Sequence, residues 1–160
     1  MKTKLNCVLI IDDDEPTNFF TNVILEESGC VNHVKMLQSG KEALDYLVAC
    51  EKAEADAVTC PSPDLIFLDI NMPVMDGWEF INEYRKLKMQ ERVIVVMLTT
   101  SLFAEDKEKA EAMREISGFE NKPLTVEKIN KILEKYFVKQ DPGSNKDYTT
   151  MQNIKKNITH

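Results

Sequence analysis

The chain has 160 residues, of which 43% are hydrophobic and 29% are charged, and its formal net charge is −7. This size and composition suit one globular domain with a core large enough to fold unaided, and exclude a second full domain. The acidic charge argues against a general nucleic-acid or membrane-surface binder, because phosphates and anionic lipids repel an acidic surface.

Four cysteines and two histidines are spread along the chain. Because no pair has Cys-x-x-Cys spacing, we expect reduced thiols rather than a zinc site or a disulfide framework. The apolar run near the N-terminus is too short for a signal sequence, and no segment reaches transmembrane length. The sequence therefore predicts a cytoplasmic protein with neither a membrane nor a nucleic acid as partner.

The first strand signal is the apolar run at residues 7–11, which is typical of a strand buried on both faces. Pro16 then stands where a helix can begin without losing a needed donor, and Gly29 offers that helix an end. Asp14 is interpreted as a capping or solvated acid. A weaker strand is predicted at residues 31–37.

A second helix is predicted from the capping-box spacing of Ser39 and Glu42. Residues 50–63 then form a long polar connection, whose prolines cannot continue a helix. The third strand is therefore expected to begin near Asp64.

The second half of the chain continues this alternation of helix and strand. Trp78, Ile81 and Tyr84 recur every three residues and predict a third helix with one buried stripe. A buried strand is predicted at residues 93–98. The helix predicted at 104–116 has strong helix formers but few apolar residues, so we expect it to be loosely held.

A short strand is predicted at residues 118–121, and Thr125 is placed to cap a last helix. Residues 139–160 lack apolar periodicity, so we expect a flexible C-terminal tail after a folded domain at 1–138. Alternating strands and helices predict an α/β fold. We expect a doubly wound, flavodoxin-like sheet of five parallel strands in the order 2-1-3-4-5, with five helices.

Polar residues stand at the end of each strong strand: Asp12 and Asp13, then Asp69, Thr99 and Lys122. The carboxyl ends of parallel strands meet at one edge of a sheet, so the three acids are expected to share a crevice. Close carboxylates repel one another, and a divalent cation such as Mg²⁺ relieves that repulsion. With a lysine and a hydroxyl left for an anion, the set is equipped for phosphoryl transfer with Asp69 as nucleophile.

Four ordered motifs, IIDDDE, LDINMPVMDGW, MLTTS and NKPL, carry a family resemblance. They resemble the receiver domain of bacterial two-component response regulators, of the stand-alone, chemotaxis-receiver-like kind, over residues 5–138. The resemblance implies a signalling switch and not an enzyme. It further implies that a sensor histidine kinase or a histidine phosphotransfer protein phosphorylates Asp69, and that the product acts on a downstream protein target.

The resemblance also implies a metal site. Asp13, Asp69 and the backbone carbonyl of Asn71 are expected to bind Mg²⁺, with Asp12 acting through water.

Other residues receive switching roles from the same resemblance. Thr99 is expected to supply the hydroxyl that moves toward the phosphoryl group, and Lys122 to pair with the phosphate through a loop with a cis Lys122–Pro123 bond. Phe119 holds the position of an aromatic switch, where many receivers carry tyrosine. A protein partner or a second copy of the chain, forming a homodimer, is expected to dock on the face 104–137.

The alternative function is a Mg²⁺-dependent aspartyl-phosphate phosphatase of haloacid dehalogenase type. That signature requires a second aspartate two residues after the nucleophile, where this chain has Asn71. A degenerate receiver that works without phosphorylation is a third possibility, which the full set of site residues disfavours.

Overall fold

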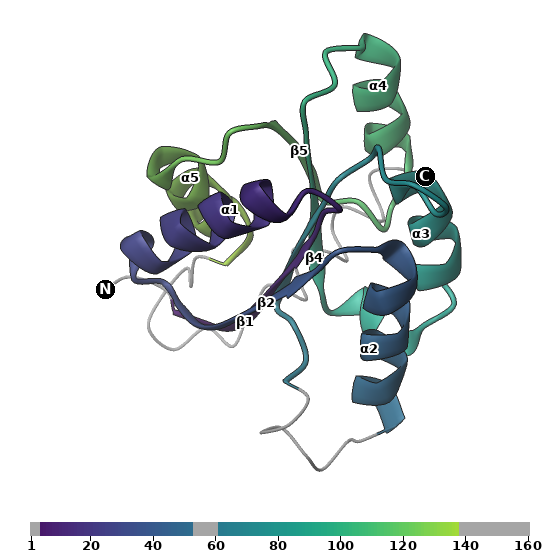
Figure 1. The fold of residues 1–160 in the computed structure, drawn as a ribbon, viewed down its shortest axis with the longest axis horizontal. Helices are drawn as coiled ribbons and strands as arrows, with labels where there is room; N and C mark the ends of the chain where they lie inside the picture. The colour runs from purple at the N-terminus through teal and green to yellow at the C-terminus, as the bar shows by residue number, and fades with distance from the viewer. Residues whose placement is uncertain (1–3, 53–60, 138–160) are drawn as a thin grey trace.

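The computed structural model describes residues 4–52 and 61–137, and within them the chain forms one parallel sheet flanked by helices (Figure 1). The strands are β1 (Leu5–Ile11), β2 (Val31–Leu37), β3 (Leu65–Leu68), β4 (Ile94–Thr99) and β5 (Gly118–Asn121). The helices are α1 (Glu15–Ser28), α2 (Gly40–Lys52), α3 (Gly77–Tyr84), α4 (Ala104–Ala112) and α5 (Val126–Tyr136), with a short 3₁₀ helix, η1 (Lys88–Glu91), before β4. The predicted tail at 139–160 lies outside the described residues.

The strand order is β2-β1-β3-β4-β5, and every neighbouring pair is parallel, which confirms the predicted topology. Helices α1 and α5 cover one face of the sheet, and α2, α3 and α4 cover the other (Figure 1). The chain changes direction across the sheet between β1 and β3. At such a switch point the connections leave toward opposite faces, so a crevice opens at the carboxyl ends of these two strands.

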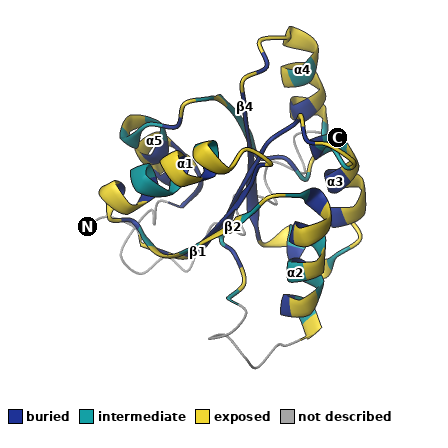
Figure 2. Cartoon of the chain, viewed as in Figure 1, coloured by how far each residue is buried: buried dark blue, intermediate teal, exposed yellow. Residues whose placement is uncertain are grey.

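The middle strands are buried on both faces, which explains their continuous apolar runs. Every residue of β3 and β4 is buried, whereas the edge strand β2 is partly exposed, as Figure 2 shows by colour. Side chains alternate along β1: Leu9 and Ile11 face the core layer under α2 and α3, while Val8 and Ile10 face the layer under α1 and α5. Burying one such side chain stabilises the fold by about 1.5–3 kcal/mol.

Local side-chain hydrogen bonds mark the starts of α1, α3 and α5, and the caps of α1 and α5 are the residues that the sequence predicted. Asp14 accepts from the Thr17 N–H at the start of α1, and Thr125 accepts from the Lys128 N–H at the start of α5. Asp76 begins α3 with a reciprocal capping box. These bonds satisfy N–H groups that the first helical turn leaves free, and they confirm Asp14 as a capping acid.

The boundaries of two helices differ from the prediction. Helix α2 continues to Lys52, so the first residues of the predicted 50–63 connection are helical, with Cys50 buried in the core. Helix α4 ends at Ala112 instead of residue 116, because Met113 adopts extended backbone angles of φ −98° and ψ 120°. The chain then turns inward and buries Ile116, which a continued helix would not place in the core.

The expectation of reduced thiols is wrong for Cys50. Cys50 is disulfide-bonded, whereas Cys7 and Cys30 are free and buried. The spacing test used on the sequence detects local metal or redox pairs and does not test for other disulfides.

Within residues 4–52 and 61–137, no helix combines the length and the apolar content needed to cross a membrane.

Candidate functional site

Three carboxylates meet at the crevice between β1 and β3. Ile11 pairs with Leu68 in the sheet, so Asp12 and Asp69 leave the two strands side by side, and the Asp69 N–H donates to the Ile11 carbonyl at 2.9 Å. Asp12, Asp13 and Asp69 each offer an oxygen, and these oxygens lie within 4.8 Å of one another. Asp12 and Asp69 are buried, whereas Asp13 is exposed. The structure therefore brings the three predicted acids together with one open side.

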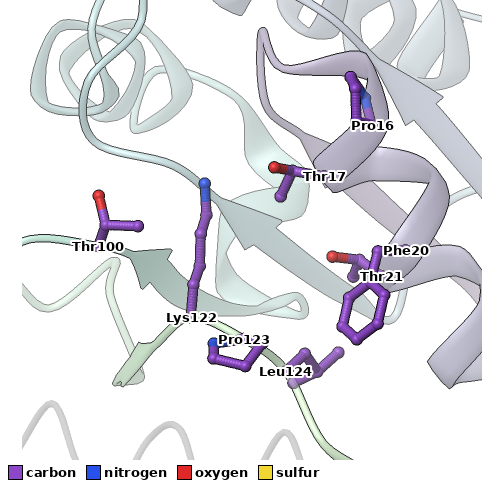
Figure 3. Close-up of a pocket in the computed structure, with 8 residues that line it drawn as sticks. All are labelled: Pro16, Thr17, Phe20, Thr21, Thr100, Lys122, Pro123 and Leu124. Carbon is purple, nitrogen blue, oxygen red and sulfur yellow. The ribbon is translucent and has the colours of Figure 1, made fainter.

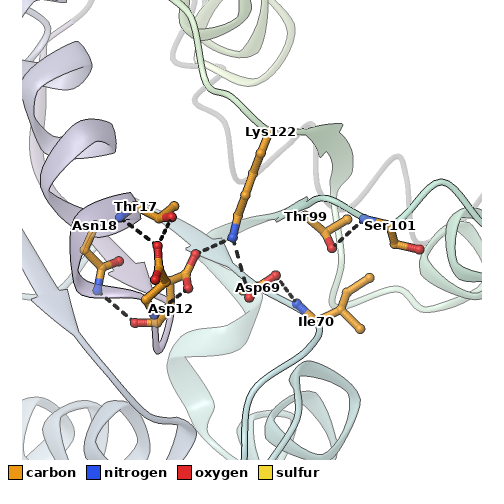
Figure 4. Close-up of polar contacts among 9 residues, drawn as sticks. Asp12, Thr17, Asn18, Asp69, Ile70, Thr99, Ser101 and Lys122 are labelled. Carbon is orange, nitrogen blue, oxygen red and sulfur yellow. Dashed lines mark hydrogen bonds and ion pairs between the residues drawn. The ribbon is translucent and has the colours of Figure 1, made fainter.

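Lys122 reaches the same crevice from the end of β5. Its Nζ lies 2.5 Å from Asp12 Oδ2 and 3.5 Å from Asp69 Oδ2 (Figure 4). The backbone fixes its position, because the Lys122 N–H donates to the Thr99 carbonyl at 2.8 Å. The Lys122–Pro123 bond that follows is cis, as predicted. One ammonium thus pairs with two of the three clustered carboxylates, which leaves excess negative charge.

Burial raises the pKa of Asp69 to about 6. The positive charge of Lys122 opposes this rise, the negative charge of Asp12 adds to it, and the Ile70 N–H, which donates to Asp69 Oδ1 at 2.9 Å, lowers the pKa again. A carboxylate with a raised pKa binds a proton more strongly than an ordinary aspartate, and it is mostly ionised above pH 7. Strongly perturbed groups of this kind concentrate at functional sites.

Thr99 lies at the end of β4, the neighbour of β3, and Phe119 lies on β5, the edge strand beyond β4. Thr99 is fully buried at the end of β4, and its Oγ1 accepts from the Ser101 N–H at 3.1 Å. Phe119 on β5 pairs with Met97 of β4 and lines a cavity of about 410 Å³ together with α4 residues such as Ala110. The two predicted switch residues therefore lie on neighbouring strands. Thr99 is two residues further along β4 than Met97, the residue that pairs with Phe119.

A second cavity, of about 390 Å³, lies beside the Lys122 side chain, between it and α1 (Figure 3). It is lined by Pro16, Thr17, Phe20, Thr21, Thr100, Lys122, Pro123 and Leu124. Thr100 is exposed on this cavity, whereas Thr99 points its hydroxyl into the interior network of Figure 4.

The residues fit a hard divalent cation. All three acidic side chains offer oxygen ligands, which Mg²⁺ prefers, and the exposed side at Asp13 suits an ion that keeps several of its waters. Asn71 is exposed in the loop that follows β3, and its expected carbonyl ligand remains a prediction.

Asn18 belongs to the site, and the sequence analysis missed it. It is buried on α1, and its Nδ2 donates to the backbone carbonyl of Asp12 at 2.8 Å, which holds the turn that carries Asp12 and Asp13. The available signal was its position one turn after the capping Asp14, on the face of α1 that packs against the sheet.

Gly77 sets the distance between α3 and the end of β3. Its N–H donates to the Ile70 carbonyl at 2.7 Å, and an added Cβ would lie 2.5 Å from the Asp69 carbonyl oxygen. We therefore expect Gly77→Ala to lower the free energy of unfolding by about 1–3 kcal/mol, measured by urea denaturation.

Gly40→Ala is the matched control for this substitution. Gly40 also opens a helix, but its added Cβ would meet only the flexible side chain of Met75, which can rotate away. A Gly40→Ala loss as large as that of Gly77→Ala would contradict the close-approach argument.

Comparisons with known proteins agree with this geometry. The family model of the response regulator receiver domain matches residues 8–134. Two-component response regulator 24 of Arabidopsis thaliana is 31% identical over 128 residues, covering 79% of this chain and 81% of that protein. A crystal structure of a two-component response regulator from Cytophaga hutchinsonii has a TM-score of 0.75 and 33% identity, covering 82% of this chain and 96% of that chain. A chemotaxis protein of Vibrio cholerae has a TM-score of 0.63 and 29% identity, covering 81% and 97% of the two chains.

These matches confirm the resemblance drawn from the four motifs and give no support to the phosphatase alternative. Receiver domains are signalling switches that histidine kinases phosphorylate, that interact with downstream targets, and that bind a divalent metal ion at an aspartate cluster such as the one here. The chain therefore belongs to the response regulator receiver domain family.

Proposed function

We propose that this receiver domain is a switch in which Asp69 accepts a phosphoryl group from a histidine of a sensor kinase or phosphotransfer protein. The observation that carries this proposal is the buried carboxylate at the end of β3, flanked by two further acids and by the Lys122 ammonium. A buried nucleophile between opposite charges suits phosphoryl transfer, which depends on positioning and on neutralising charge.

The transfer forms one bond and breaks another. A carboxylate oxygen of Asp69 attacks the phosphorus, and the P–N bond to the imidazole breaks. The electron pair of that bond goes to the imidazole nitrogen, which takes one proton from solvent. Lys122, already within 3.5 Å of Asp69, pairs with the negative oxygens of the transferred group.

Asp13, Asp69 and the Asn71 carbonyl are proposed to hold Mg²⁺, with Asp12 acting through water. The ion, when bound, neutralises charge on the phosphoryl oxygens. Lys122, which pairs with Asp12 and Asp69 in this structure, would pair with the phosphoryl group when the acids hold the ion.

The phosphorylated form is proposed to act through protein contact. Thr99 moves toward the phosphoryl group and Phe119 repacks. The equilibrium between the conformations of the face 104–137 then shifts. A downstream protein or a second copy of the chain then docks on this face. The net charge of −7 makes direct action on nucleic acid unfavourable.

Phosphoramidate tests this proposal, because its P–N bond mimics that of phosphohistidine. We expect the full chain with Mg²⁺ to gain the mass of one phosphoryl group and to keep it long enough for intact-mass detection. Release of phosphate without any accumulated mass gain would indicate a phosphatase, and absence of any reaction would indicate a receiver that works without phosphorylation. Either result would contradict the proposed switch.

A further inference from the structure

Ser101, between β4 and α4, uses all its polar groups to tie three elements together. Its N–H donates to Thr99 Oγ1 at 3.1 Å, and its carbonyl accepts from Asn121 Nδ2 of β5 at 2.9 Å. Its hydroxyl donates to Asp106 Oδ2 of α4 and accepts from the Phe103 N–H at 3.3 Å. Ser101 is only 8% exposed, so water competes weakly for these bonds.

The start of α4 depends on this serine. The N-cap residue, Phe103, makes no side-chain cap hydrogen bond, and within the helix only Ala110 is buried. The Ser101 hydroxyl substitutes for the missing cap. It accepts a hydrogen bond from the Phe103 N–H and donates one to Asp106 in the first turn of the helix. With so little apolar burial, this link is a large part of what fixes the N-terminus of α4.

The same serine restrains the Thr99 hydroxyl. If Thr99 moves toward a phosphoryl group on Asp69, then either its contact with the Ser101 N–H breaks or Ser101 moves with it. In the second case Ser101 pulls on Asp106 and the first turn of α4. The neighbouring Leu102 and Phe103, which are 89% and 72% exposed, lie on the segment that would move.

We propose that Ser101 is a positioning residue for Thr99, and that its bond to Asp106 holds Thr99 in the resting position and couples its movement to α4. This role rests on the proposed function of Asp69 and Thr99. If this role is correct, Asp106 on α4 controls the fraction of molecules in which Thr99 has moved toward Asp69.

Asp106→Ala tests the proposal in the full chain. It leaves the Ser101 hydroxyl without its acceptor, so the conformation with Thr99 moved inward becomes more populated. We expect amide hydrogens at 99–106 to exchange faster by about fivefold or more without any phosphodonor. We also expect the label from phosphoramidate to form faster by a similar factor, because a larger fraction of the protein is competent to react.

Two variants separate positioning from a general effect on the helix. Glu105→Ala removes the same charge from the same first turn, but Glu105 is exposed and has no bond to Ser101 among the described contacts, so exchange and labelling should stay near wild type. Asp106→Asn keeps an acceptor oxygen for the Ser101 hydroxyl and should restore both rates most of the way toward wild type.

Equal effects of Asp106→Ala and Glu105→Ala would overturn the proposal, because the helix dipole would then explain both. Faster exchange with an unchanged labelling rate would also overturn it, since Asp106 would then only cap the helix. If the wild type forms no label, the proposed function fails and this role fails with it. If the wild type is labelled and Asp106→Ala is labelled no faster, this role alone fails.

Discussion

Asp69→Asn is expected to raise the free energy of unfolding by about 2–3 kcal/mol at pH 7.5 and to change it little at pH 4. The folded-state pKa of Asp69 is about 6, above the ordinary value near 4, because the carboxyl group is buried. The folded chain therefore holds this proton more tightly than the unfolded chain. The resulting stability is fully present below pH 4 and is lost as the pH rises through 6. An asparagine carries no charge at this buried position, so the variant does not lose stability as the pH rises.

Urea denaturation without divalent cations at the two pH values measures this effect. Asp13→Asn is the control, because it removes a carboxylate from the same cluster at an exposed position. We expect its effect to be smaller at pH 7.5 than that of Asp69→Asn. A stability gain for Asp69→Asn that is the same at both pH values would show that ionisation of Asp69 in its buried position is not its source.

Mg²⁺ is expected to stabilise the wild-type chain by about 2.7 kcal/mol at a concentration one hundredfold above its Kd. The ion would bind the folded state, where three carboxylates lie close together, and the unfolded chain has no such cluster. Asp13→Ala should remove most of this gain, because Asp13 is the acid on the open side of the site.

Thermal unfolding with and without Mg²⁺ measures the gain, and Asp14→Ala provides the matched control. Asp14 is the next acid in the chain, but its side chain caps α1 and is not part of the carboxylate cluster. Asp14→Ala should destabilise the protein slightly and keep the Mg²⁺ shift. Equal loss of that shift in both variants would show a diffuse effect of negative charge instead of a site.

The fold was largely predictable because its signals are local or periodic. Strands buried on both faces, such as β3 and β4, must read as unbroken apolar runs, and helix ends are marked by short-range hydrogen bonds such as that of Asp14. The end of α4 was not predictable in this way. Ala104 to Ile116 has uniform helix propensity, and the break at Met113 comes from the tertiary demand to bury Ile116.

The acids of the site were predictable from strand ends, whereas their environment was not. Parallel pairing alone brings Asp12 beside Asp69. The raised pKa of Asp69 depends on how completely neighbouring groups exclude water, which no motif encodes. The hydrogen bonds of Asn18 and Ser101 likewise depend on side-chain directions across different elements, and spacing along one element does not report these directions.

Intact-mass measurement of the wild type and of Asp69→Asn, each incubated with phosphoramidate and Mg²⁺, tests the central claim most directly. We expect the wild type to gain one phosphoryl group and the folded variant to gain none, because the variant lacks the buried carboxylate at the end of β3 that lies 3.5 Å from Lys122 Nζ. A label that persists on Asp69→Asn, at Asp12, Asp13 or any other residue, would contradict the assignment of Asp69 as the phosphoryl acceptor.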